Sequence, residues 1–184
     1  NTSTLENPSH TYAAAGTYTV TLTVTNGCGS NSTTQVVTVQ SCPDVVVDGG
    51  FEAGIGAGTW VEFSATFGTP LCDLAGCGNG TGTGPRTGNI WAWFGGIPGT
   101  TETASVSQSI TIPVGGTVTL TFYLEQIVCD DPTDFMEVSV DGNIVFTTDG
   151  GSALCGVLGY SLQTVDISSF ADGNAHTLTF NGTT

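Results

Sequence analysis

The chain has 184 residues, which is room for one large domain or two small ones. Lys and Arg total 1 against 16 Asp and Glu, and this formal charge of −15 excludes nucleic acid and anionic membrane surfaces as partners. Hydrophobic residues make up 39% of the chain, which is too many for a disordered protein. No apolar run approaches the roughly 18 residues of a membrane-spanning helix, so no membrane insertion is expected.

Alternation of apolar and polar residues predicts β-strands along the chain, and helical periodicity is almost absent. The stretch 17–25 alternates Tyr, Val and Leu with Thr, as a half-buried strand does. The same alternation returns in the segments 106–112, 118–124 and 136–140. Short strands at this spacing, separated by Gly-containing turns, indicate an all-β sandwich architecture.

A domain boundary is expected at residues 41–44, where the Thr-rich alternation stops and Cys42-Pro43 precedes a short predicted strand at 45–47. A first unit of about 40 residues is too small to bury the apolar faces of two sheets. The chain is therefore expected to begin inside a domain.

The six cysteines favour an oxidising compartment, and therefore a secreted or cell-surface location. Spacing predicts one disulfide between Cys72 and Cys77, across a short Gly-containing loop, and one between Cys129 and Cys155, at the base of a hairpin. Cys28 and Cys42 flank an extended strand of about eight residues, roughly 25 Å long. A disulfide needs Cα atoms within about 7 Å. These two cysteines are therefore predicted to have other partners, which for Cys28 lie outside this chain.

The sequence contains no catalytic constellation, so a non-catalytic protein is predicted. Its histidines are His10 and His176, and it has neither a G-x-S-x-G elbow nor an H-E-x-x-H motif. His176 shares strand parity with Leu178, which predicts a position at the edge of the core. Arg86 is the only cation, and it is expected to form an ion pair or bind carbonyl groups in its Gly-rich loop, with substrate binding as the alternative.

Clustered carboxylates make a structural Ca²⁺ the one cofactor that the sequence suggests, because this hard cation takes about six to eight oxygen ligands. One cluster flanks Gly-Gly-Phe and the other lies within residues 129–134. The candidate ligands are Asp48, Glu52, Asp130, Asp131 and Asp134. Solvated loop charge is the alternative interpretation.

Two tryptophans are candidates for a carbohydrate-binding platform. Trp91 and Trp93 lie on one face of a predicted strand, with Ala92 and Phe94 on the other. Exposed rings could stack on sugars, whereas large aromatics in a sandwich usually belong to the core. Four N-x-[ST] sequons are candidate glycosylation sites, at Asn1, Asn31, Asn79 and Asn181.

The first 41 residues resemble the C-terminal strands of a PKD (polycystic kidney disease) domain, an immunoglobulin-like sandwich common in bacterial surface proteins. The resemblance is carried by residues 7–12 (NPSHTY), 16–26 (GTYTVTLTVTN), Gly29-Ser30 and the strand that ends at Val39. It implies a structural role for His10, and it implies that the earlier strands of such a domain are absent from these residues.

Residues 45–184 resemble the jelly-roll accessory domains, MAM-like or galactose-binding-like, of secreted bacterial proteins. The resemblance is carried by the segments 48–52 (DGGFE), 67–72 (FGTPLC), 84–88 (GPRTG), 91–96 (WAWFGG), 106–110 (VSQSI) and 138–142 (VSVDG). It implies a structural calcium near Gly-Phe-Glu, which favours Glu52 as a ligand. It also implies that the last strand of the jelly roll is missing.

These features predict a non-catalytic structural or adhesive module of a large extracellular bacterial surface protein or fibre, with one repeat of a tandem array as one form that it could take. Its expected partners are neighbouring domains or copies of the same chain, joined by exchange of edge strands. The alternative is a carbohydrate-binding accessory module of a secreted hydrolase, with polysaccharide as the partner. An enzyme would need paired carboxylates across a cleft, and no segment places such a pair.

Overall fold

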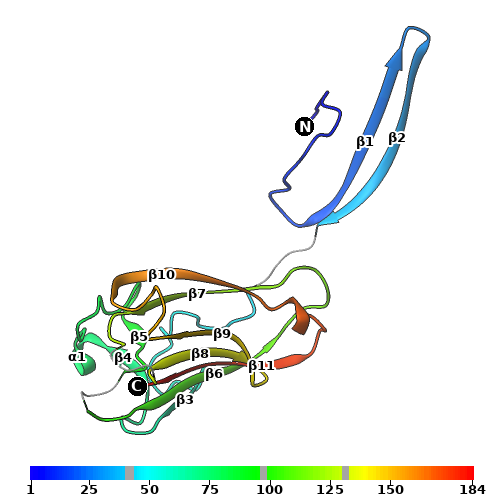
Figure 1. The fold of residues 1–184 in the computed structure, drawn as a ribbon. Helices are drawn as coiled ribbons and strands as arrows, with labels where there is room; N and C mark the ends of the chain where they lie inside the picture. Colours follow the sequence, from blue (N-terminus) through cyan, green and yellow to red (C-terminus); the bar gives the residue numbers. More distant parts are fainter. Residues whose placement is uncertain (40–43, 96–98, 130–132) are drawn as a thin grey trace. The chain divides into compact units, whose positions relative to one another are not determined.

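The computed structural model describes residues 1–39, 44–95, 99–129 and 133–184. The chain divides into two compact units, Asn1–Asp44 and Val45–Thr184 (Figure 1). Strands dominate both units, which confirms the predicted all-β class. The α-helix of the described ranges, α1 (Leu74–Cys77), has four residues, and no helix there is long and apolar enough to cross a membrane.

The first unit contains one antiparallel hairpin, formed by β1 (Gly16–Asn26) and β2 (Gly29–Val39). The predicted alternation is present, because threonines of β1 lie on one face and aliphatic residues on the other. Leu22 and Val24 on the aliphatic face are 62% and 63% exposed. Near the start of β1, the Tyr18 ring packs on Tyr12 at a centroid distance of 4.3 Å, and the Tyr18 hydroxyl donates to the Ala14 carbonyl.

The second unit is a two-layered β-sandwich (Figure 1). One layer is a five-stranded antiparallel sheet in the order β3-β6-β11-β8-β9, in which β11 lies between strands that are far away in sequence. Its strands are β3 (Val61–Ser64), β6 (Thr103–Thr111), β11 (Ala175–Thr183), β8 (Phe135–Val140) and β9 (Asn143–Asp149). The other elements are β4 (Leu71–Asp73), β5 (Ile90–Ala92), β7 (Thr119–Gln126), β10 (Val157–Asp166) and the 3₁₀ turn η1 (Ser168–Phe170). They form the pairs β4-β5 and β7-β10.

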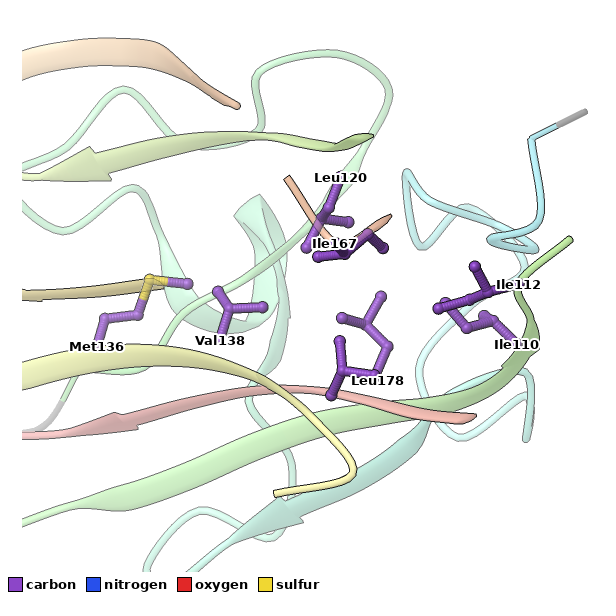
Figure 2. Packing of buried hydrophobic residues seen from close by; sticks show 8 residues of the cluster. Ile110, Ile112, Leu120, Met136, Val138, Ile167 and Leu178 are labelled. Atoms are coloured by element: carbon purple, nitrogen blue, oxygen red, sulfur yellow. The ribbon is translucent and has the colours of Figure 1, made fainter. Parts of the chain in front are cut away.

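The core lies between the five-stranded sheet and the β7-β10 pair (Figure 2). Leu178 of β11 and Val138 of β8 are completely buried and belong to the same cluster as Leu120 of β7. Their alternation with Ser and Thr places the polar residues on the outer face of the sheet. A second cluster, around Trp60, Leu71 and Val106, joins β4 and β5 to the same layer.

The predicted strand at residues 45–47 is absent. Val47 instead pairs with a side chain, because the Gln108 amide donates to the Val47 carbonyl and accepts from the Val47 N–H, both at 2.8 Å. Gln108 is buried within β6 and also donates to the Thr59 carbonyl. A glutamine side chain thus satisfies the backbone groups that a neighbouring strand would otherwise bind. The length of an apolar run does not indicate which of these two partners is present.

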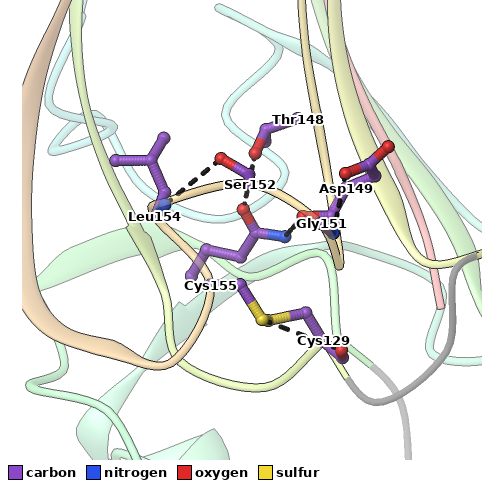
Figure 3. The surroundings of a disulfide bond; sticks show 8 residues. Cys129, Thr148, Asp149, Gly151, Ser152, Leu154 and Cys155 are labelled. Atoms are coloured by element: carbon purple, nitrogen blue, oxygen red, sulfur yellow. Dashed lines mark hydrogen bonds between the residues drawn. A yellow bond between two sulfur atoms is a disulfide. The ribbon is translucent and has the colours of Figure 1, made fainter.

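Both predicted disulfides are present. Cys72 bonds to Cys77, and Cys129 bonds to Cys155 (Figure 3). Beside the second bond, the Gln126 amide accepts from the Thr148 hydroxyl and donates to the Asp149 carbonyl. These contacts connect the end of β7 to the end of β9, where the disulfide closes the intervening loops.

Candidate functional site

The two candidate tryptophans lie on the outer face of the short β4-β5 pair. Their neighbours Ile90, Ala92 and Phe94 pack against the core cluster around Trp60, so the predicted division of the strand into two faces is correct. Trp91 lies opposite Cys72 in the strand register. Both tryptophans are half-buried and belong to neither core cluster.

Trp93 lines a groove with a volume of about 450 Å³, which is within the usual range of ligand pockets. The apolar part of the lining includes Ile55 and Phe67, which are 45% and 46% exposed. Thr69 and Asp73 supply polar atoms, and the Cys72–Cys77 disulfide forms part of the wall. The groove therefore combines an aromatic surface with a small number of hydrogen-bonding groups.

Two glycines fix the orientation of the Trp93 ring. A Cβ atom at Gly95 would lie 2.1 Å from the indole Nε1, and one at Gly80 would lie 2.9 Å from Cη2 at the far end of the ring. Any side chain at either position would displace the ring. The close approach of both backbone segments thus holds Trp93 in place before a ligand arrives.

A second, smaller hollow adjoins this groove. It has a volume of about 240 Å³, and its lining includes Leu74, Pro85 and Asn89. Asp73 lines both hollows. The Asp73 carboxylate caps helix α1, because Oδ1 accepts the Gly76 N–H at 2.6 Å, and this contact fixes the side chain at the junction.

Glu52 holds the rim of the smaller hollow. Its Oε1 accepts the N–H groups of Asn89 and Ile90 at 2.8 and 2.9 Å, and its Oε2 accepts the Asn89 side-chain amide. The two backbone hydrogen bonds keep the pKa of Glu52 below its ordinary value. A Cβ at Gly88 would lie 2.3 Å from the same carboxylate, so this position needs glycine.

The predicted calcium ligands accept hydrogen bonds from neighbouring N–H groups where the structure describes their contacts. Glu52 faces three N–H groups, which suit an anion that accepts hydrogen bonds and do not suit a metal ligand. Both oxygens of Asp48 accept the Ala53 N–H at 3.2 Å. Asp134 is half-buried, and Asp130 and Asp131 lie outside the described residues. Within the described ranges, no three or more His, Cys, Asp or Glu gather as a metal site. Calcium binding stays a prediction.

Arg86 has a different contact from the one expected. Its guanidinium stacks over the Tyr123 ring of β7, 3.4 Å from the ring centroid, in a cation–π contact. The loop that carries Arg86 is held by Glu125, whose Oε2 accepts the N–H and hydroxyl of Thr83 at 3.0 Å. Tyr160 adds a hydrogen bond from its hydroxyl to the Gly84 carbonyl. Within the described ranges, the contact that Arg86 makes is this aromatic stack, and the expected ion pair or carbonyl contact stays a prediction.

The two histidines occupy different surroundings. His10 is exposed and packs edge-on against Tyr12 at a centroid distance of 4.7 Å. His176 is buried, as its parity with Leu178 predicts. Its Nδ1 bonds to Asp141 at 2.7 Å and its Nε2 to Asp172 at 2.9 Å, so both ring nitrogens are engaged.

The remaining candidate residues lie mostly at the surface. Asn1, Asn31 and Asn79 are exposed, whereas Asn181 is half-buried within the central strand β11. Cys28 is a free, exposed cysteine at the hairpin turn, and Cys42 lies outside the described residues. Glycosylation and an external partner for Cys28 stay predictions.

Comparisons with known proteins found a family match for the first unit and a similar solved structure. Residues 1–41 match the profile of the PKD domain family. A comparison with curated protein sequences found no similar protein. Among solved structures, the chain is similar to one described as "Structural basis for the promiscuous specificity of the carbohydrate-binding modules from the beta-sandwich super family". That structure is 18% identical, with a TM-score of 0.40, covering 95% of this chain and 70% of the other. The MAM-like detail expected for residues 45–184 is not established.

Sequence reasoning identified Trp93 but missed its neighbours in the groove. Ile55 and Phe67 precede β4 and lie in irregular segments, where no periodicity marks them. Asp73 carries one usable signal, because Asp before a short run that ends in Gly is typical of a helix N-cap. Only the fold brings these residues beside a tryptophan of the next strand.

Proposed function

We propose that this chain is a non-catalytic extracellular module whose second unit binds carbohydrate in the groove at Trp93. The single observation that supports this proposal is an aromatic side chain outside the core, fixed by Gly80 and Gly95, that lines a groove of about 450 Å³. The two disulfides are consistent with an extracellular location.

The chemistry of the lining suits a sugar ring. The apolar C–H face of a pyranose packs on an aromatic surface such as Trp93 or Phe67, while its hydroxyls need acceptors and donors at the edge. Asp73 accepts one hydrogen bond from Gly76 and retains Oδ2 as an acceptor within the described contacts. Thr69 donates its hydroxyl to Glu62 and accepts the Leu71 N–H, so it presents a fixed oxygen to the groove.

A glycan array followed by calorimetry tests this proposal. Trp93→Ala should abolish binding to any glycan that the unaltered chain retains, because it removes the aromatic surface of the groove. Phe63→Ala is the matched control, since Phe63 is a 53% exposed aromatic on β3 that does not line the groove. Equal binding by the Trp93→Ala variant, or no binding of the unaltered chain to any glycan, would reject the proposal.

A second candidate function is a structural or adhesive element of a surface protein or fibre, and the β1-β2 hairpin favours it. The hairpin sequence carries no charged residue, and its aliphatic face is exposed at Val20, Leu22 and Val24. Uncharged strands with free edges can pair with another copy, whereas the acidic second unit would repel its like.

Self-association tests this second candidate. Multi-angle light scattering of the chain over a concentration series should show dimers or larger species joined through the hairpin. Leu22→Asp should shift the population to monomer, because it places a charge on the aliphatic face. Thr21→Asp, which places the same charge on the opposite face, is the control for charge alone. A monomer at all concentrations would exclude assembly by this route.

A further inference from the structure

The two hollows beside the β4-β5 pair share a lining residue, so a single ligand could extend from one to the other. The groove at Trp93 and the smaller hollow at Asn89 have Asp73 as a common lining residue. Their volumes are about 450 and 240 Å³. A compact ligand at Trp93 would leave the second hollow unused, whereas a linear ligand would occupy both.

We infer that the site recognises at least two consecutive units of a neutral, linear polysaccharide, with Asp73 at the junction between the units. This inference rests on the proposed carbohydrate-binding function and adds the class of ligand. The first unit packs on Trp93, and the second enters the hollow beside Asn89 and Leu74. The Oδ1 atom of Asp73 accepts the Gly76 N–H, and Oδ2 accepts hydrogen bonds from sugar hydroxyls on both sides of the glycosidic linkage.

The second hollow offers polar groups of its own. The Asn89 amide nitrogen donates to Glu52 at 3.2 Å, and its side-chain oxygen accepts no hydrogen bond within the described residues. Asn89 lines this hollow together with Pro85 and Leu74, the latter 58% exposed. The lining thus repeats, on a smaller scale, the combination of an apolar surface and a fixed acceptor.

Charge selects a neutral chain over an acidic one. Among the described residues, Asp73 is the only acidic residue that lines either hollow, and neither lining includes Lys, Arg or His. Arg86 follows Pro85 in sequence, but its guanidinium stacks on Tyr123. A carboxylated or sulfated sugar would meet the Asp73 carboxylate and a chain of formal charge −15, with no local cation to compensate.

The test uses an array of neutral and uronate oligosaccharides, each from one to six units, with affinities from calorimetry for the series that binds. Neutral oligosaccharides of two or more units should bind at least about tenfold more tightly than the monosaccharide. Asn89→Ala should lower oligosaccharide affinity about fivefold, as expected for one lost hydrogen bond, and leave monosaccharide affinity unchanged. Asn79→Ala, an exposed asparagine of the same loop outside both linings, is the control.

The outcomes separate this inference from the function on which it rests. Binding that is lost in Trp93→Ala but is equal for one and several units would overturn the two-unit site and retain the carbohydrate function. Preference for uronates would overturn the neutral ligand class. An Asn89→Ala effect of equal size on monosaccharide and oligosaccharide would also overturn the two-unit site. The absence of any signal on the array would reject the carbohydrate function itself.

Discussion

His176 connects two turns that lie apart in sequence. Its ring bonds to Asp141, in the turn between β8 and β9, and to Asp172, in the loop after η1. Asp141 also accepts the Thr177 N–H, and Asp172 accepts the Asn174 N–H. The ring packs edge-on against Phe170. Both ring nitrogens can donate only in the imidazolium, so the charged form of His176 is the one that fits.

This arrangement predicts an optimum of stability at mildly acidic pH. The hydrogen bonds to Asp141 and then Asp172 raise the pKa of His176 above 6.5, so its contribution is complete below 6.5 and is lost as the pH rises through the raised value. Hydrogen bonds, the largest from Asn174, lower the pKa of Asp172 from 3.8 to about 2. The contribution of Asp172 to folding stability is therefore complete above pH 3.8 and is lost as the pH falls toward 2.

Thermal melting followed across this range should show the highest Tm between about pH 4 and 6.5. His176→Gln should remove the decline on the alkaline side, and a decline that persists in this variant would contradict the role of His176.

At the scale of elements, β11 organises the sandwich because it lies between β6 and β8 and supplies Leu178 to the core. Leu178 is fully buried, so Leu178→Ala should destabilise the protein by about 2–5 kcal/mol through lost burial and the cavity left behind. Thr177→Ala changes the neighbouring exposed residue of the same strand and should cost no more than about 0.5 kcal/mol. Urea denaturation measures both values. Similar losses of stability in the two variants would show that Leu178 and Thr177 do not lie on buried and exposed faces of β11, respectively.

The disulfides join elements over different sequence separations, which predicts unequal contributions. Cys129 and Cys155 are 26 residues apart, and Cys72 and Cys77 are 5 apart. Closing a longer loop removes more entropy from the unfolded chain. Replacing Cys129 and Cys155 with serines should therefore lower the free energy of unfolding by about 3.5 kcal/mol, and replacing Cys72 and Cys77 should lower it by about 2 kcal/mol. Denaturation of the two double variants under non-reducing conditions checks the order. A larger loss of stability for the Cys72 and Cys77 variant would contradict this order, and would indicate that this disulfide acts by stabilising the native state instead of restricting the unfolded chain.

At the scale of the whole molecule, the chain comprises two units, and the buried residues of the described ranges lie in the second. Both core clusters, the two hollows and both disulfides lie within Val45–Thr184. Residues 45–184 produced alone should therefore fold, melt within a few degrees of the same unit in the full chain, and give the same glycan profile. Calorimetry and the array measure these properties. A truncated chain that fails to fold would show that the first unit contributes to the stability of the second.

The strand pattern was predictable to the extent that one face of each strand is buried. Alternation in β6, β7 and β8 identified the buried residues, whereas the same alternation in β1 marks an aliphatic face that is exposed. The opposite faces of Trp91 and Ala92 followed from the same period of two. The strand predicted at residues 45–47 was wrong, because an apolar run does not indicate what binds its backbone. Here the Gln108 amide, and not a neighbouring strand, forms hydrogen bonds with the Val47 N–H and carbonyl.

The sequence by itself determined the all-β class and the two disulfides, because these depend on local periodicity and on short spacings. Only the tertiary structure decided that Trp93 lies in a groove with Phe67, that Asp73 joins two hollows, and that Arg86 stacks on Tyr123. These contacts join irregular segments distant in sequence, and their geometry depends on how the sheets pack. Local backbone preferences do not determine contacts of this kind.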